Sequence, residues 1–151
     1  LDLLARKIIG TQGEVLKPFA KDVSVFCQEN IDNAEMAEFI QPIMAYAKEW
    51  HDLTTMIGAK AMKNPDEIGG ASVDYLMFSG YVTLAYFWAK MAKVAQTKLT
   101  LGTEDTAFYQ AKIKTAQFYI QRMLPRAKGH AACISNGVDS MMALDSEDFV
   151  F

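Results

Sequence analysis

An apolar stripe with helical spacing constrains the fold of this chain more than any other feature. In residues 33–63, apolar side chains recur every three or four positions, the repeat that places them on one face of an α-helix. The stripe consists of Met36, Ile40, Ile43, Ala47, Trp50, Thr54, Ile57 and Ala61. Pro42 is expected to kink this helix or to mark where its regular part starts. No segment of the chain has the alternation of a β-strand, so the sequence predicts an all-α fold.

A second helix is predicted to precede this one. Residues 11–14 read Thr-Gln-Gly-Glu, which matches the capping box found at helix starts. A proline is tolerated only in the first turn of a helix. The regular helix is therefore expected to begin at Lys17 or Pro18 and to end near Asn30.

Two more helices are predicted over residues 71–99 and 103–136. Residues 64–66 (Asn-Pro-Asp) and the pair Gly69-Gly70 are expected to supply the break before the first of them. This helix is apolar most of the way round, which is typical of the most enclosed helix of a bundle. The last helix contains Pro125, so a bend is expected there.

Short connectors join these helices, which favours an up-and-down antiparallel four-helix bundle. We expect the bundle domain to span residues 11–138. Residues 1–10 are predicted to form a short N-terminal helical segment, and residues 139–151 a C-terminal tail that either docks its apolar side chains or stays mobile. The sequence starts without Met, at Leu1, inside an apolar run of helical spacing. We therefore expect it to continue a helix of a longer polypeptide.

Charge and hydropathy exclude several classes of partner. The chain carries 15 basic and 18 acidic residues, for a net charge of −3, and no basic run, which argues against nucleic acid. The longest uncharged stretch, residues 75–89, is shorter than the roughly 20 residues of a membrane span. Arg6 and Lys7 interrupt the N-terminal apolar run, so no signal peptide is predicted. We expect a cytoplasmic protein whose Cys27 and Cys133 are buried thiols rather than a disulfide.

The sequence gives little support for a metal-binding site. A carboxylate-bridged di-iron bundle needs Glu-x-x-His on two helices. Here Lys48 stands three positions before His51, and Ala127 three positions before His130. A zinc site would need four ligands and therefore every histidine and cysteine of the chain, Cys27 and Cys133 included. We predict no metal site.

Aromatic and methionine side chains are concentrated in the third predicted helix, and they allow two interpretations. They can open a pocket for an apolar ligand, because methionine adapts to varied guests. They can also fill the core, as aromatic residues at helical spacing normally do, and we favour this interpretation. The residues are Tyr75, Phe78, Tyr81, Tyr86, Phe87, Trp88 and Met91.

Three stretches together resemble a known family. They are LDLLARKIIGTQGEVL at residues 1–16, SVDYLMFSGYVTLAYFWAKMA at residues 72–92 and YQAKIKTAQFYIQRMLPRA at residues 109–127. In this order they resemble the extra C-terminal helical domain of a bacterial branch of the acyl-CoA dehydrogenases. In that family a Tyr-Glu-Gly-Thr segment, whose glutamate is the catalytic base, normally precedes the stretch matching residues 1–7. The resemblance therefore implies that residues 1–10 link to an upstream dehydrogenase domain.

The resemblance implies a parent enzyme that uses FAD to dehydrogenate an acyl-CoA thioester between its α and β carbons. It also implies an electron-transfer flavoprotein as acceptor and a homo-oligomeric state. No acidic residue here matches the catalytic base, so we predict no catalytic, cofactor-binding or metal-binding residue in this chain. The expected role is accessory: packing, subunit association or bordering the active site. The alternative is an independent bundle that binds an apolar ligand or acts in oligomerisation.

Overall fold

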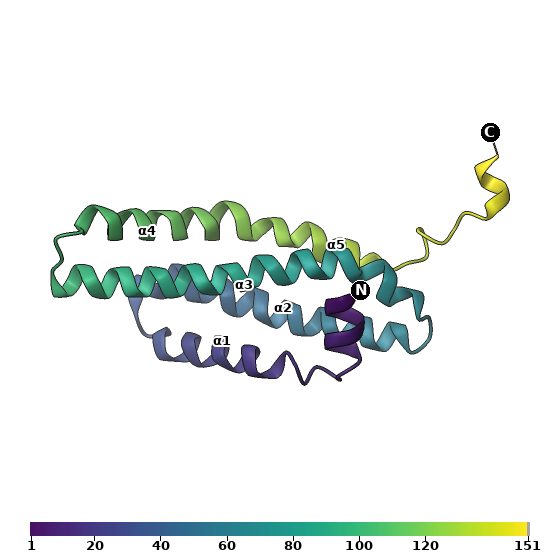
Figure 1. Cartoon of the computed structure of the whole chain (residues 1–151), viewed down its shortest axis with the longest axis horizontal. Helices are drawn as coiled ribbons and strands as arrows, with labels where there is room; N and C mark the ends of the chain where they lie inside the picture. Colours follow the sequence, from purple (N-terminus) through teal and green to yellow (C-terminus); the bar gives the residue numbers. More distant parts are fainter. Residues whose placement is uncertain (151) are drawn as a thin grey trace.

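Four antiparallel helical rods make up the fold, as the computed structural model of the protein shows for residues 1–150 (Figure 1). No strand occurs within these residues. The predicted all-α, up-and-down bundle is confirmed. The rods are α1 (Lys17–Asn30), α2 (Ala37–Ala61), α3 (Asp66–Leu101), and a last rod made of α4 (Thr106–Phe118) and α5 (Ala127–Asn136).

The N-terminal segment is helical, and it belongs to the same core as the rods. Residues Asp2–Ile9 form a π-helix, whose turns are wider than those of an α-helix. Leu4 and Ile8 are only 1% and 2% exposed, and the segment contacts α3. That it also links to an upstream domain stays a prediction.

The connection into α1 differs in part from the prediction. Thr11 donates its hydroxyl to the Lys7 carbonyl at 2.6 Å, so it completes the preceding segment rather than capping the next helix. The regular helix begins at Lys17 with Pro18 in its first turn, as predicted. The capping-box expectation was wrong because a second helix end lay within reach of the same hydroxyl.

The predicted stripe of α2 forms one wall of the core. Five of its members, Met36, Ile40, Ile43, Trp50 and Ile57, are buried. A 3₁₀ turn at Ala34–Met36 precedes the helix, and α2 itself starts at Ala37. Pro42 therefore lies inside α2 and does not mark the start of its regular part.

The break predicted at Gly69-Gly70 is wrong, because both glycines lie inside α3. The helix starts earlier, at Asp66, whose backbone N–H donates to the side-chain oxygen of Asn64 at 3.1 Å. Acidic residues in this first turn favour a helix start through the helix dipole. At Gly70 a Cβ would lie 3.0 Å from Val138 Cγ2, so this glycine serves close packing.

The last rod is interrupted around Pro125, as predicted. A π-helical turn, Tyr119–Met123, is followed by a 3₁₀ turn, Leu124–Arg126, and then by α5. Buried side chains continue through the interruption, with Ile120 and Leu124 8% and 0% exposed. The proline therefore changes the local hydrogen bonding while the rod keeps its place on the core.

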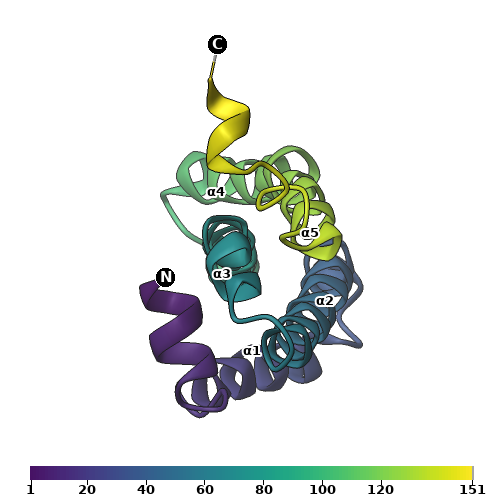
Figure 2. The same cartoon turned by 90° about the vertical axis from the view of Figure 1, so that its right-hand side faces the viewer.

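α3 is the central helix, but it is not enclosed on all sides. It contacts α2, α4, α5 and the N-terminal segment, and the end-on view shows these elements around it with one side left open (Figure 2). Its inner face, Tyr75, Phe78, Val82 and Ala85, is at most 1% exposed. Its opposite side, named here the outer face, is between 38% and 72% exposed. The outer face consists of Val73, Leu76, Met77, Leu84, Phe87, Met91 and Val94.

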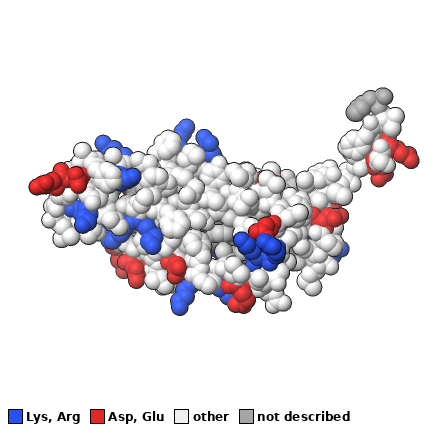
Figure 3. Space-filling view, in the orientation of Figure 1, with Lys and Arg blue, Asp and Glu red and all other residues white. Residues whose placement is uncertain are grey.

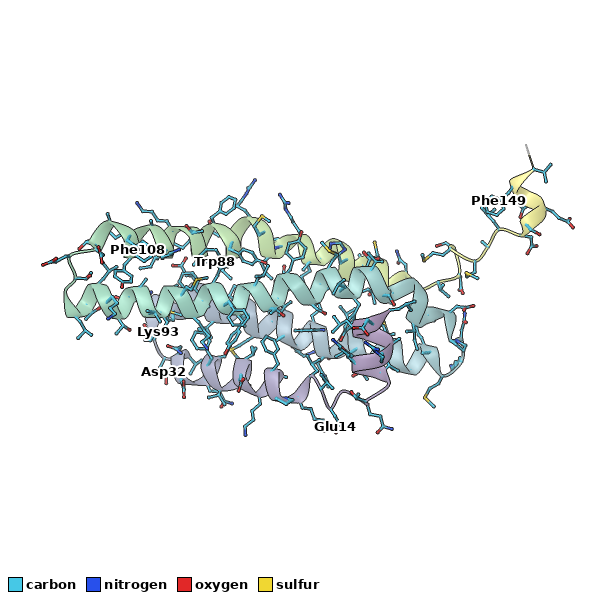
Figure 4. The ribbon with its side chains drawn as sticks, viewed as in Figure 1. Glu14, Asp32, Trp88, Lys93, Phe108 and Phe149 are labelled. Atoms are coloured by element: carbon cyan, nitrogen blue, oxygen red, sulfur yellow. The ribbon has the colours of Figure 1, made fainter. Side chains whose placement is uncertain are left out.

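The C-terminal tail extends away from the bundle (Figure 1), and Phe149 lies on its short 3₁₀ turn Ser146–Phe149 (Figure 4). Its apolar side chains are exposed, with Met141 at 65% and Phe149 at 62%. Of the two predicted alternatives, the structure therefore shows an undocked tail. Phe151, the last residue of the predicted tail, lies outside the described residues.

Candidate functional site

A groove between α1 and α2 is a concave feature that could hold a ligand. It encloses about 660 Å³, which is within the usual range of ligand pockets. Buried apolar side chains form its floor, and α3 contributes Val82 alone to its lining. Other floor residues are Ile8, Val23, Cys27 and Trp50, while the exposed rim contains Lys17, Ser24, Gln28, His51 and Thr55.

Small side chains on the facing surfaces of the two helices leave this space open. α1 presents Ala20 and Ser24, and α2 presents Ala47 and Gly58. A Cβ added at Gly58 would have a single neighbouring atom within 4 Å, the Ile9 Cδ1 at 3.9 Å. The groove therefore follows from side-chain size along two helices that otherwise pack normally.

The floor of the groove is uncharged at neutral pH. Burial raises the pKa of the Cys27 thiol above its ordinary value, so the thiol stays protonated. Thr54 donates to the Trp50 carbonyl at 2.7 Å, and its oxygen lies 2.7 Å from the Tyr75 hydroxyl, which therefore donates to it. Burial also raises the pKa of Tyr75. Such a floor suits an apolar group and supplies no acid or base for catalysis.

The rim of the groove does not fit a flavin dinucleotide. A pyrophosphate needs convergent cations or a helix N-terminus with free N–H groups. The rim contains one lysine, Lys17, and its charge is paired with Glu14. We therefore assign no flavin contact to this groove and propose no chemical step within it.

The four candidate metal ligands lie in different surroundings. Cys27 lies in the floor of the groove and His51 on its rim. Cys133 is an exposed thiol of α5, so the prediction of two buried thiols is confirmed for Cys27 and wrong for Cys133. His130 instead meets a partner on α3: its Nδ1 lies 2.7 Å from Asp74 Oδ1. Within residues 1–150, no three His, Cys, Asp or Glu side chains are close enough to hold a metal ion.

Sequence reasoning missed the pairing of His130 with Asp74. The two residues are 56 positions apart, and no short motif joins them. The imidazole also stacks on Tyr81, with 5.9 Å between ring centroids. The cluster ties α5 to α3, and it lacks the nucleophile that would make a His–Asp pair catalytic.

The aromatic residues of α3 divide between two roles. Tyr75, Phe78 and Tyr86 are buried in the core, as favoured from the sequence, whereas Phe87 is 46% exposed. Trp88 points toward the last rod and stacks on Tyr119, with 6.4 Å between ring centroids (Figure 4). The groove described above is not lined by these aromatic side chains.

A hydrogen bond from a tyrosine hydroxyl links the last rod to α3. The Tyr119 hydroxyl donates to the Tyr81 carbonyl at 3.1 Å. Burial, with a smaller contribution from Tyr81, raises the pKa of Tyr119 to about 12. The neutral phenol is therefore strongly preferred in the folded protein.

The sequence from residue 19 to residue 145 matches the model of the family described as "Acetyl-CoA dehydrogenase C-terminal like". The match spans most of the chain, from α1 into the C-terminal tail. The chain belongs to this family. The resemblance found in the sequence is thereby confirmed.

A curated relative supports the same conclusion. The chain is 27% identical over 143 residues to the 3-methylmercaptopropionyl-CoA dehydrogenase of Ruegeria pomeroyi. The alignment covers 93% of this chain and 24% of the relative. The chain therefore spans about a quarter of that relative's length. No helix within residues 1–150 is long and apolar enough to cross a membrane.

Proposed function

We propose that this chain is a non-catalytic accessory domain of an FAD-dependent acyl-CoA dehydrogenase. Membership of the dehydrogenase C-terminal family over residues 19–145 carries the proposal. The relative's name supports an acyl-CoA thioester as the parent's substrate. In the parent, FAD would accept a hydride during α,β-dehydrogenation and pass electrons to an electron-transfer flavoprotein. We place this enzyme in the cytoplasm, where the free thiols Cys27 and Cys133 would remain reduced.

The geometry supports an accessory role rather than a catalytic one. The groove has an uncharged, apolar floor, and the His130–Asp74 pair lacks a nucleophile. By contrast, the bundle exposes a row of large apolar side chains on the outer face of α3. Contiguous apolar patches of this kind mark surfaces that are covered in an assembly. The proposed role is therefore to hold other parts of the dehydrogenase together.

The purified 151-residue chain provides a direct test. We expect it to be colourless, without the visible absorbance of flavin, and to show no turnover of acyl-CoA with an artificial electron acceptor. Adding FAD should leave its melting temperature unchanged, because a ligand that does not bind the native state does not stabilise it. Stoichiometric flavin in the purified chain would overturn the proposal.

A second candidate function, apolar ligand binding, is favoured by the groove of about 660 Å³. It predicts that a long-chain fatty acid raises the melting temperature and changes the fluorescence of Trp50, which lines the groove. Gly58→Leu should abolish both changes, because the side chain would occupy the open space beside Ile9. Absence of any shift in the unmodified chain would eliminate this candidate.

Val25→Glu is the matched control for the ligand test. Val25 lies on α1 and is exposed, but it does not line the groove. The substitution should leave the fatty-acid response intact. Equal loss of response in both variants would show that the fatty acid binds elsewhere.

A further inference from the structure

The start of the C-terminal tail packs on the central helix. A Cβ built at Gly70 of α3 would lie 3.0 Å from Val138 Cγ2 and 3.4 Å from Met141 Sδ. A turn holds Met141 there, because its backbone N–H donates to the Val138 carbonyl at 2.9 Å. Val138 is only 3% exposed. The tail is therefore anchored to the bundle beside Gly70.

This anchor lies at the start of a row of exposed apolar side chains. Three members of the outer face, Met77, Leu84 and Met91, follow Gly70 at steps of seven residues. A helix drifts by only about 20° over seven residues, so these positions lie on nearly the same side of α3. The three side chains are between 38% and 51% exposed. The surface on which the anchor packs therefore continues along α3 as an exposed apolar row.

An apolar hollow of about 400 Å³ lies at the far end of this row, between α3 and α4. Two lysines, Lys90 and Lys112, stand at its edge, and neither forms an ion pair within residues 1–150. Their Nζ atoms lie 5.3 Å and 5.1 Å from the ring centroids of Tyr86 and Phe108. The hollow therefore suits an apolar group that stands next to a negative charge. Its apolar lining consists of Phe87, Met91, Val94, Phe108 and Tyr109.

The tail beyond its anchor has the matching chemistry. Residues 139–151 include four acidic side chains and no lysine or arginine. Phe149 directly follows Glu147 and Asp148, and its ring is 62% exposed. The space-filling view shows acidic side chains on the tail, and basic ones around the end of the bundle where α3 meets α4 (Figure 3). Tail and hollow are thus complementary in charge, and both are apolar at the centre.

We propose that this hollow is the docking site of the chain's own tail. The tail folds back along the row, places the Phe149 ring in the hollow and brings Asp148 near Lys90 and Lys112. Figure 1 shows the open arrangement, and docking gives a closed one. A tail joined to the bundle meets the hollow at an effective concentration of about 1 mM, which a second copy reaches only if the protein itself is that concentrated.

The length of the tail fits this arrangement. The eight residues from Met141 to Phe149 span at most about 28 Å when extended. Phe87, at the near edge of the hollow, follows Gly70 by 17 residues, or about 26 Å of helix. The tail reaches the hollow only as extended chain, so its 3₁₀ turn opens on docking. This inference goes beyond the accessory role and does not rest on it, since neither flavin nor another domain takes part.

Disulfide trapping in the full 151-residue chain tests the docking. In a Cys133→Ser background, Met91→Cys places one thiol in the hollow and Val150→Cys places another beside Phe149. In a glutathione buffer we expect an intramolecular disulfide whose rate of formation is the same from about 1 to about 100 µM protein. The matched control pairs Val150→Cys with Val25→Cys on α1, which lies across the bundle from α4 (Figure 2). Its intramolecular disulfide should form at least about tenfold more slowly.

Two outcomes of the trapping would overturn the proposal. A disulfide between chains, formed faster at higher protein concentration, would show that the tail docks on a second copy. Equal intramolecular rates for the two cysteine pairs would show that the tail has no preferred site. Circular dichroism should show all variants folded, since every substituted position is exposed.

Charge reversal tests the lysines of the hollow. Lys90→Glu combined with Lys112→Glu should slow trapping about tenfold, because the new carboxylates would repel the acidic tail. Adding Glu147→Lys and Asp148→Lys to the same chain should restore most of the rate. An unchanged rate after reversal of the two lysines, or no recovery in the combined variant, would contradict the proposed docking.

Substitution of Phe149 tests the apolar part of the contact. Phe149→Ala should slow trapping about tenfold, because the ring no longer leaves water by entering the hollow. Phe149→Leu should keep most of the rate. Lys21→Glu combined with Lys63→Glu, at exposed positions outside the hollow, is the control for net charge and should leave trapping unchanged. If Phe149→Ala is trapped as fast as the parent pair, the hollow does not receive this ring and the proposal fails.

Discussion

The inner and outer faces of α3 are both apolar, but one is buried and the other is exposed. Tyr75, Phe78 and Val82 on the inner face are at most 1% exposed, whereas Leu84 and Phe87 on the outer face are 51% and 46% exposed. Hydropathy describes what a side chain gains by leaving water, but it does not say which element covers it. Within residues 1–150 the other elements cover one face only. Burial of the inner face therefore stabilises the bundle, whereas the outer face is available to contact another surface.

The largest expected effect comes from truncating one phenylalanine on each face. Phe78→Ala should lower the free energy of unfolding by about 3–5 kcal/mol, because it removes a fully buried side chain and leaves a cavity. Phe87→Ala should change it by no more than about 0.5 kcal/mol, since the ring is already in contact with water. Urea unfolding at a protein concentration too low for association measures both. Similar losses for the two variants would contradict the division into faces.

A smaller effect is expected where α3 meets the last rod. Tyr119→Phe should cost about 1 kcal/mol, because the Tyr81 carbonyl loses its hydroxyl donor. The pKa of Tyr119 is raised from 10.0 to about 12 in the folded protein. The folded state therefore binds more protons than the unfolded state between these values, so stability is kept below pH 10 and lost as pH rises toward 12.

Chemical unfolding at a series of alkaline pH values measures this loss, which should be shallower in Tyr119→Phe. Tyr109→Phe makes the same chemical change on the more exposed part of the rod and is the control. It should alter stability at neutral pH by less than about 0.5 kcal/mol. An unchanged alkaline profile in Tyr119→Phe would mean that other groups govern the transition.

The smallest effect compares two adjacent glycines of α3. Gly69→Ala should raise the free energy of unfolding by about 0.5–1 kcal/mol, because a helix favours alanine and no atom lies within 4 Å of the new methyl group. Gly70→Ala should gain less or lose stability, because its methyl group would lie 3.0 Å from Val138 Cγ2. Thermal unfolding of both variants decides the matter. An equal gain at both positions would show that the Val138 side chain can move aside with no loss of stability.

The sequence predicts the rods of this fold well because their signal is periodic. The stripe of α2 and the first-turn Pro18 of α1 need only local rules, and both are confirmed. The start of α3 was predicted too late in the chain. A glycine pair, judged only from the residues next to it, indicates a helix break, but here both glycines lie inside the helix. Only the packing of Val138, which approaches from the other end of the sequence, explains a glycine at position 70.

The features of the candidate sites were harder to predict. The groove depends on the distance between α1 and α2, and small residues such as Ala47 and Gly58 give no signal that a space will stay unfilled. The His130–Asp74 contact joins residues of two helices at a spacing that no motif encodes. The exposure of one side of α3, where Leu84 lies, was missed for a related reason. The sequence shows that a side chain is apolar, but it does not show whether another element packs over it.

The interruption around Pro125 has a consequence for the buried side of the last rod. A π turn at Tyr119–Met123 under-winds the helix, and the 3₁₀ turn at Leu124–Arg126 over-winds it. The two deviations offset each other, so Ala116 before them and Ala127 and Ala131 after them all face the core. The proline thus interrupts the regular hydrogen bonding of the rod without turning its buried side away from the core. α4 and α5 therefore keep a common angular phase, and the buried side of the rod runs continuously from one helix into the other.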